Sequence, residues 1–414
     1  MNFLYNTGIS AYALAARLAA CRSKKVRLML KGQARSFGKI AQARAKCAPN
    51  GFDLWFHAAS LGEFEQARPL IEKYRQEQPE LKILLTFFSP SGYEVRKNYD
   101  KVDCVAYLPF DKPNLVSEFL KVARPAKAIF VKYEFWGNFL TQLKEQNIPV
   151  YLIDAIFRPK QAFFRRSGGM FRRMLGCYTH IFVQDKNSAD LLSGIAVDNV
   201  TVAGDTRFDR VAKVMDTQIN LPQISAWLND TPFTIVAGSS WPQDEACYLT
   251  WLNAHTDVKA IIAPHEFDAQ RLKTLRAAID GKSALWTEVV SGACQLDDDV
   301  QALIIDTFGL LSSLYRFGNL ALVGGGLGAG IHNINEAAVY GIPVVFGPNH
   351  HKFKEAADLI ACKGAYQYTD KNTLATILDS LHTDPAALQA SGASSGAYIR
   401  ANLGATHTIY QALN

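Results

Sequence analysis

Two carboxylates of the chain follow apolar runs, at places where a side chain could act as a base. Glu63 stands three residues after Ser60, just beyond the run LWFHAA that begins at Leu54, and Glu134 follows the run AIFV. Ser-x-x-Glu spacing is typical of a capping box at a helix start. Desolvation raises the pKa of such a carboxylate while the helix dipole lowers it, so it can be tuned to accept a proton. From the residues alone, a purely structural capping role for Glu63 is an equal alternative.

The second feature is a loop very rich in glycine. Glycine occupies five of the seven positions from Gly324 to Gly330, after an apolar run at 320–323. Glycines allow positive φ and let a ligand approach the main-chain N–H groups closely. Asn333 is expected to be the N-cap of a following helix, with Glu336 three residues later. The pattern predicts a strand, loop, helix and strand around a bound anion.

Short apolar runs that alternate with helical patterns position these residues. They predict parallel strands and a doubly wound α/β fold, with strands at 54–59, 82–87, 104–108, 128–131, 150–153, 180–183, 234–237, 259–263, 302–305 and 320–323. In such sheets, ligands bind beyond the carboxyl ends of the strands. The turns expected at that edge contain Gly238, Ser239 and Ser240, then Pro264 and His265, then Phe308 and Gly309.

The length of 414 residues favours two domains. We expect a basic amphipathic membrane-associating segment at 1–50, an N-terminal Rossmann-like domain at 51–210, a C-terminal one at 211–396 and a terminal helix at 397–414. Polar residues interrupt the first 20 positions too often for a spanning helix. An interfacial anchor is the preferred interpretation of that segment.

Basic residues are unevenly distributed. Ten cations precede the first acidic residue, Asp53, and six more lie in an acid-free stretch between Asp154 and Asp185. Aromatic residues accompany the second cluster. Clusters of this kind bind polyanions, either an anionic membrane surface or nucleic acid, or form an ordinary solvated face.

The composition argues against disulfide and metal chemistry. The seven cysteines are scattered, odd in number and without a C-x-x-C pair, so we expect a reducing compartment. His332, His350 and His351 stand apart from carboxylates, so they do not indicate a metal site. We therefore expect no metal and no cofactor.

Six segments in order give a specific resemblance. They are WFHAASLGEFEQARPLI, KYEFWGNFL, VQDKNSADLL with VAGDTRFD, AGSSWPQDE, DTFGLLSSLY and GGGLGAGIHNINEAA. Together they resemble the 3-deoxy-D-manno-octulosonic acid (Kdo) transferase family over nearly the whole chain. The resemblance implies a GT-B glycosyltransferase with two Rossmann-like domains facing a cleft. It also implies an inverting, metal-independent transfer of Kdo from CMP-Kdo to a lipid A precursor, at the cytoplasmic face of the inner membrane.

The resemblance also implies roles for particular residues. Glu63 matches the family's general base, and Glu134 matches the carboxylate that positions the acceptor or helps the base. The positions expected to bind CMP are Gly238, Ser239, Ser240, Pro264, His265, Phe308, Gly309, Leu310, Gly330, His332, Asn333, Ile334, Asn335 and Glu336. Among them, main-chain N–H groups from Gly330 to Asn333 are expected to meet the phosphate, and Glu336 a ribose hydroxyl.

The chain departs from the family pattern at two of these positions. His265 stands where the family has an arginine, and Leu310 replaces a common glutamate. Histidine offers a weaker, pH-dependent charge, so the detailed contacts to CMP are expected to differ. For the carboxylate of the donor sugar, charge complementarity suggests Arg158, Arg207 or Lys132 as partners.

Two other functions remain open from the residues. One is another GT-B enzyme with a UDP-sugar donor, because such sites share the glycine-rich loop. The other is a non-catalytic protein that binds a membrane or RNA surface through its basic stretches. The repeated glycine and serine turns after strands favour an enzyme, and we expect no nucleic-acid partner.

Overall fold

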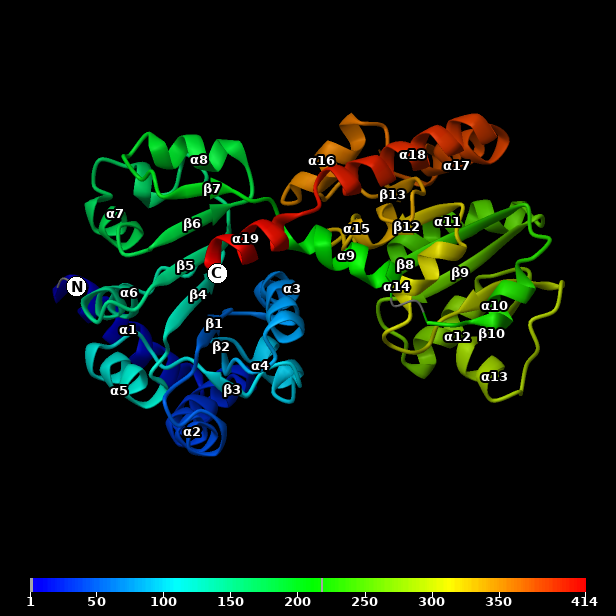
Figure 1. The fold of residues 1–414 in the computed structure, drawn as a ribbon. Coiled ribbons are helices and arrows are strands. Elements are labelled where there is room, and N and C mark those ends of the chain that lie inside the picture. The colour runs from blue at the N-terminus through cyan, green and yellow to red at the C-terminus, as the bar shows by residue number, and fades with distance from the viewer. Residues whose placement is uncertain (1–2, 217–218) are drawn as a thin grey trace. The chain divides into compact units, whose positions relative to one another are not determined.

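The computed structural model describes residues 3–216 and 219–414, so Met1 and Asn2 of the expected anchor lie outside the described residues. The chain forms two compact units. Unit 1 comprises the residues up to Arg210 together with Leu403–Asn414, and unit 2 comprises Val211–Asn402. Each unit contains one parallel β-sheet covered by helices (Figure 1). The predicted doubly wound α/β fold is confirmed.

Unit 1 is built on a seven-stranded sheet of order β3-β2-β1-β4-β5-β6-β7. Its strands are β1 (Leu54–His57), β2 (Ile83–Phe87), β3 (Cys104–Tyr107), β4 (Lys127–Val131), β5 (Val150–Ala155), β6 (His180–Val183) and β7 (Val200–Val202). All neighbouring pairs are parallel. The carboxyl ends of β1 and β4 therefore lie next to each other at one edge of the sheet.

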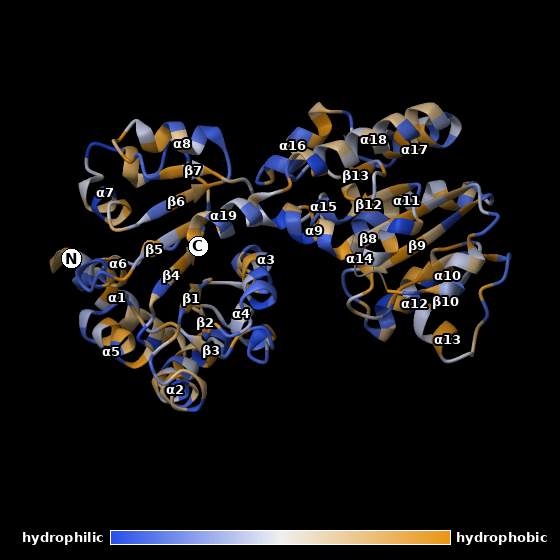
Figure 2. Cartoon of the chain, viewed as in Figure 1, coloured by the Kyte–Doolittle hydropathy of each residue, from blue (hydrophilic) through white to orange (hydrophobic). Residues whose placement is uncertain are grey.

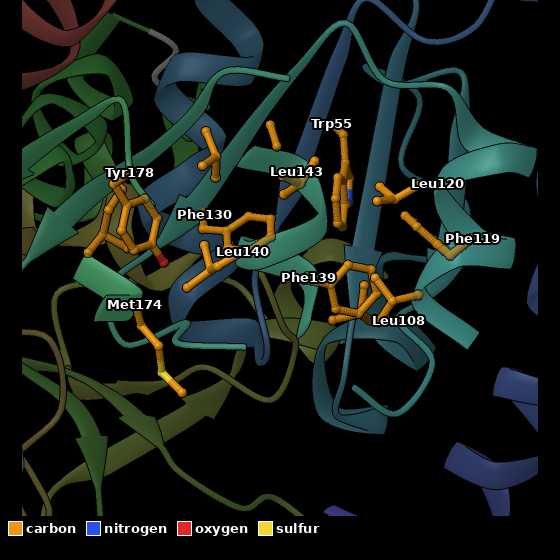
Figure 3. Packing of buried hydrophobic residues seen from close by; sticks show 14 of the residues in the cluster. Trp55, Leu108, Phe119, Leu120, Phe130, Phe139, Leu140, Leu143, Met174 and Tyr178 are labelled. Carbon is orange, nitrogen blue, oxygen red and sulfur yellow. The ribbon is translucent and has the colours of Figure 1, made fainter. Parts of the chain in front are cut away.

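Helices cover both faces of this sheet, because successive strand residues point to opposite sides. Trp55 packs against Phe119, Phe130 and Phe139 on one face, with ring centroids 4.8 to 5.5 Å apart (Figure 3). Phe56, the next residue, lies in the core of the other face. The strands of both units are largely hydrophobic (Figure 2), as expected for strands buried on two sides.

The helices of unit 1 begin with two that form the expected basic segment. The helices are α1 (Phe3–Ala19), α2 (Lys24–Cys47), α3 (Leu61–Glu77), α4 (Pro90–Arg96), α5 (Pro113–Ala123), α6 (Gly137–Glu145), η1 (Ala162–Phe164), α7 (Gly169–Leu175), α8 (Lys186–Ser193) and α19 (Ala405–Leu413). A further helix, α9 (Thr206–Asp216), begins in unit 1 and ends in unit 2. Of the helices described, none has both the length and the apolar content to cross a membrane.

Unit 2 repeats the plan with a sheet of order β10-β11-β9-β8-β12-β13-β14. Its strands are β8 (Phe233–Ser240), β9 (Val258–Pro264), β10 (Lys282–Leu285), β11 (Val300–Ile304), β12 (Leu320–Val323), β13 (Val344–Phe346) and β14 (Ala365–Gln367). Its helices are α10 (Pro222–Trp227), α11 (Pro242–Ala254), α12 (Ala269–Ala277), α13 (Trp286–Val290), α14 (Leu311–Leu314), η2 (Tyr315–Phe317), α15 (Asn335–Ala338), α16 (Lys354–Ala361), α17 (Lys371–Thr383) and α18 (Pro385–Ala401).

The end of the chain differs from the single helix expected over 397–414. α18 ends at Ala401, and α19 begins after Gly404, whose φ of 107° is readily adopted only by glycine. The Asp209 carboxylate accepts the N–H groups of Gly404 (2.7 Å) and Thr406 (2.6 Å). Through α19, Ile409 and Leu413 join the core of unit 1.

Candidate functional site

A buried histidine–glutamate pair lies at the carboxyl edge of the unit 1 sheet. His57 is the last residue of β1, and Glu134 lies just beyond β4; their side chains are buried and meet with 2.8 Å between Nε2 and Oε2. The indole N–H of Trp136 donates to the same carboxylate oxygen. The Tyr178 hydroxyl donates to the main-chain oxygen of Glu134 at 2.5 Å. The loop after β4 is thus fixed by both side-chain and main-chain contacts.

The contacts of His57 hold its ring at both nitrogens. Nδ1 is 3.2 Å from the Thr86 carbonyl oxygen and 2.9 Å from Thr86 Oγ1. The Thr86 hydroxyl can donate to Nδ1 or accept from it, so these contacts fit either tautomer of the ring. On the other side of the ring, Nε2 and the Glu134 carboxylate are at hydrogen-bond distance, 2.8 Å. One hydrogen therefore lies between His57 and Glu134.

Glu63 stands at the start of α3, where the predicted capping box is confirmed. Its Oε2 accepts the N–H (2.9 Å) and the hydroxyl (3.2 Å) of Ser60. Within the described part of the chain, Oε1 of Glu63 has no hydrogen-bond partner. Burial and then the charge of Glu134 raise the pKa of Glu63, against the opposing effects of His57 and the Ser60 bonds. A half-buried carboxylate with raised pKa and one free oxygen is suited to accept a proton.

In unit 2, close packing explains part of the glycine density. A Cβ on Gly324 would lie 2.3 Å from the Ser239 carbonyl oxygen, and one on Gly326 would lie 2.6 Å from main-chain atoms of Gly347. Gly325 and Gly330 have φ values of 91° and 122°, in the region that favours glycine. The loop therefore needs these glycines to pass between the ends of neighbouring strands, whether or not a ligand is bound.

Most main-chain N–H groups of this loop bind acceptors within the protein. Gly325 donates to the Asp244 carboxylate at 2.9 Å. Gly330 donates to the Gly325 oxygen (3.0 Å), and Ile331 and His332 donate to the oxygens of Asn349 and Gly324 (3.3 Å each). Among the described residues, the N–H groups of Asn333 and Ile334 have no acceptor. Of the stretch expected to meet a phosphate, Asn333 is left available, joined by Ile334.

The helix after the loop starts later and is shorter than expected. α15 spans only Asn335–Ala338 with Ile334 as its N-cap, whereas Asn333 was expected in that position. Asn333 instead accepts the N–H of Asn335 (3.2 Å) and donates to Glu336 Oε1 (2.9 Å). A single turn has little macrodipole, so free N–H groups, more than a helix end, would bind an anion here. Asn335 is fully buried, and among the described residues neither of its side-chain polar atoms has a partner.

Three aromatic rings bring together residues from separate predicted turns. The Trp241 and His265 rings stack at 4.4 Å, the His265 and His332 rings lie 4.7 Å apart, and Trp241 Nε1 donates to His332 Nε2 at 3.3 Å. The His265 N–H donates to the Ser240 oxygen at 2.9 Å. Burial, and then the nearby charge of His265, lower the pKa of His332. A cavity of about 190 Å³ lies beside Trp241, Asp244 and the glycine-rich loop.

The remaining residues that were expected to bind CMP differ in their packing and exposure. A Cβ on Gly238 would collide with the Tyr315 hydroxyl at 2.0 Å. Burial, and then the nearby charge of Glu336, raise the pKa of Tyr315. Phe308 is 85% exposed with its ring 4.5 Å from Phe267. The other three positions are placed by the backbone, with Gly309 at positive φ, Leu310 capping α14 and Pro264 ending β9.

The cations proposed for a sugar carboxylate differ in availability. Arg207 binds Asp205 through both Nε (2.9 Å) and Nη2 (2.6 Å), so an internal carboxylate already engages it. Lys132 has a φ of 67° and places Nζ 5.8 Å from the Tyr133 ring. Burial raises the pKa of Tyr133, and the nearby charge of Arg158 opposes this shift. Arg158 and Lys132 therefore both lie near Tyr133, one residue before Glu134.

Comparisons with known proteins agree with this arrangement. Residues 14–210 match the model of the 3-deoxy-D-manno-octulosonic-acid transferase family. The chain is 26% identical over 336 residues to the 3-deoxy-D-manno-octulosonic acid transferase of Aquifex aeolicus, covering 79% of this chain and 85% of that protein. It is 27% identical over 399 residues to that of Bordetella pertussis, covering 91% and 90%. The resemblance to the Kdo transferases is confirmed.

Solved structures extend the likeness to the fold of both units. UDP-GlcNAc 2-epimerase from Neisseria meningitidis matches with a TM-score of 0.60 and 12% identity, covering 87% of this chain and 99% of that one. A putative UDP-N-acetylglucosamine 2-epimerase from Listeria monocytogenes matches with a TM-score of 0.58 and 12% identity, covering 88% and 96%. The predicted GT-B architecture of two Rossmann-like domains is confirmed.

The sequence patterns did not indicate His57, Trp241 and Asp244 as site residues. His57 and Trp241 were visible in the segments shared with the Kdo transferase family, WFHAAS and AGSSWPQDE, and Asp244 lies in the second of them. Their roles follow from contacts with residues far away in the chain, which a linear pattern does not show.

We predict that Glu134→Gln lowers the pKa of Glu63. The substitution removes the neighbouring charge that raises this pKa; it also weakens the opposing effect of His57, which is the smaller of the two. Carbon-13 NMR titration of the Glu63 carboxylate, assigned with Glu63→Gln, measures the change. Glu77→Gln, on the exposed end of the same helix, is the matched control. An unchanged or raised pKa in Glu134→Gln would contradict this electrostatic account.

Proposed function

We propose that the protein transfers Kdo from CMP-Kdo to a hydroxyl of a lipid A precursor, lipid IVA, in lipopolysaccharide core biosynthesis. The observation that carries the proposal is Glu63, half-buried with a raised pKa and one free oxygen, inside the region that matches the Kdo transferase family. The name shared by the curated relatives supports the donor sugar.

The proposed reaction is a single displacement with inversion at the anomeric carbon. The acceptor oxygen forms a bond to that carbon while its proton passes to Oε1 of Glu63. The bond between the anomeric carbon and the phosphate oxygen of CMP breaks, and CMP leaves with the electron pair. The hydrogen bond with His57 keeps the Glu134 carboxylate near the base, where its charge helps to raise the pKa of Glu63.

On the donor side, we assign the CMP phosphate to the free N–H groups of Asn333 and Ile334 and to the ring of His265. Glu336, held by Asn333 at 2.9 Å, would accept a ribose hydroxyl, and the buried amide of Asn335 would bind a further polar group of the nucleotide. Neutral donors and a histidine suit a leaving group that has one phosphate, and no step of this mechanism requires a metal.

For the acceptor, we propose a peripheral position on the cytoplasmic face of the inner membrane. Phe3, Leu4, Leu14 and Leu18 expose apolar side chains on α1. The first acidic residue of the chain, Asp53, comes after ten cations. An exposed apolar helix face among cations is complementary to an anionic lipid surface that holds a phosphorylated glycolipid.

The direct test is incubation with CMP-Kdo, generated in situ, and tetra-acylated lipid A precursor, followed by mass analysis. We expect a product heavier by one or more Kdo residues. Calorimetric titration with CMP and with UDP separates the UDP-sugar alternative, and absence of any nucleotide binding with salt-dependent RNA binding would favour the non-catalytic one.

We expect Glu63→Gln to reduce kcat by roughly 10²- to 10⁴-fold, the usual contribution of a general base. Affinity for CMP should stay unchanged, because the proposed CMP residues belong to unit 2. Initial rates and calorimetry measure the two effects, with Glu77→Gln as the matched control. Transfer at wild-type rate by Glu63→Gln would exclude Glu63 as the base.

We expect His265→Arg to strengthen CMP binding by about tenfold, since a guanidinium carries a permanent charge and can form charge-assisted hydrogen bonds to a phosphate. Calorimetric titration with CMP measures the change. His407→Arg adds the same side chain at an exposed position of α19 and serves as control. Weaker binding in His265→Arg would show that the ring stack, not charge, is what the nucleotide needs.

A further inference from the structure

The first helix of the chain is hydrogen-bonded to the loop that holds Glu134. The Tyr5 hydroxyl on α1 donates to Asp111 Oδ2 at 2.6 Å and accepts the N–H of Gly137 at 3.0 Å. Asn6 Oδ1 accepts the side-chain N–H of Asn138 at 2.8 Å. Gly137 and Asn138 begin α6, directly after the 134–136 segment. Side chains from α1 thus fix the end of that loop.

Asp111 connects these contacts to the start of α6. It is fully buried, and its carboxylate accepts the main-chain N–H groups of Asn138 and Phe139, both at 2.9 Å. The N-cap residue of α6, Trp136, makes no side-chain hydrogen bond to the start of the helix. Asp111, which is distant in the sequence, caps the helix instead. Burial raises the pKa of Asp111 to about 6, although the Tyr5 hydroxyl and the two N–H groups oppose the shift.

A second route from α1 reaches the other end of the loop through aromatic rings. The Tyr12 ring stacks on Phe88 at 6.4 Å, and Phe88 lies 5.0 Å from the ring of Trp136. The Trp136 indole then donates to the Glu134 carboxylate. Polar contacts therefore hold the residues after the loop, and aromatic contacts hold Trp136 and, through it, Glu134.

We infer that α1 is a positioning element for the reaction, with Tyr5 as its main positioning residue. By holding Gly137 and Asp111, Tyr5 keeps Trp136 and Glu134 in place beside His57 and Glu63, so the helix proposed to meet the lipid also sets the surroundings of the base. The inference deepens the proposed function and rests on it for its catalytic consequence. Its structural part, an α1-dependent loop, can be tested without substrate.

Tyr5→Phe tests the inference, because it removes one hydroxyl and keeps the ring. Tyr151→Phe is the matched control: among the described residues the Tyr151 hydroxyl has no hydrogen-bond partner, and it lies on β5, outside the loop. Amide hydrogen exchange over 134–139 in the full chain should quicken by roughly fivefold in Tyr5→Phe, the usual worth of one hydrogen bond. The control should match the wild type.

Two further readouts separate positioning from mere stability. In Tyr5→Phe, NMR titration should show a lower pKa for Glu63, because a looser Glu134 no longer opposes its ionisation as strongly. With acceptor dispersed in detergent, kcat should fall by roughly fivefold while KM for CMP-Kdo stays constant.

The outcomes are distinguishable. Unchanged exchange and an unchanged Glu63 titration overturn the inference, as does faster exchange with wild-type kcat. If the wild-type chain transfers no Kdo, the proposed function fails, whereas exchange and titration still decide whether α1 positions the loop.

Discussion

The hydrogen bond between His57 and Glu134 is the interaction on which the unit 1 site depends. Both groups are buried, and burial of a charge without a partner is costly, so each group is stable there only with the other. Removal of one partner from such a pair typically costs about 3–5 kcal/mol. The strand order places β1 beside β4, which lets the His57 and Glu134 side chains reach each other. Thr86 holds the His57 ring through Nδ1, the nitrogen that does not contact Glu134.

Burial and this pair together explain how Glu63 can cap a helix and still have a raised pKa. A capping carboxylate alone would have its pKa lowered by the helix start and by the Ser60 bonds. Burial and the adjacent Glu134 reverse that direction, while one oxygen remains free. The two interpretations that the sequence left open are therefore compatible: Oε2 caps α3, and Oε1 is available for chemistry.

In unit 2, close packing requires glycines in the glycine-rich loop whether or not a ligand is bound. Asp244 accepts N–H groups from Gly325 and from Trp241, and the Tyr368 hydroxyl donates to its other oxygen at 2.9 Å. The loop is thereby held in shape from inside the protein. After this passage, the N–H groups of Asn333 and Ile334 have no acceptor among the described residues.

Local patterns predicted the fold well and the site only in part. Continuous apolar runs identified most strands, because strands buried on two faces have no polar alternation. The short edge strands β7, β10 and β14 were missed, since each has only three or four residues and is partly exposed. The contacts of His57 with Glu134 and of Gly325 with Asp244 join residues 77 and 81 positions apart. Such contacts follow from strand order and packing, which a linear pattern does not contain.

The return of the C-terminus to unit 1 has a consequence for biosynthesis. Ile409, Tyr410 and Leu413 belong to the core formed by β1, β2 and α3, so that core lacks part of its apolar contacts until these three residues are made. On the ribosome, all residues of unit 2 therefore emerge before those that complete the core of unit 1.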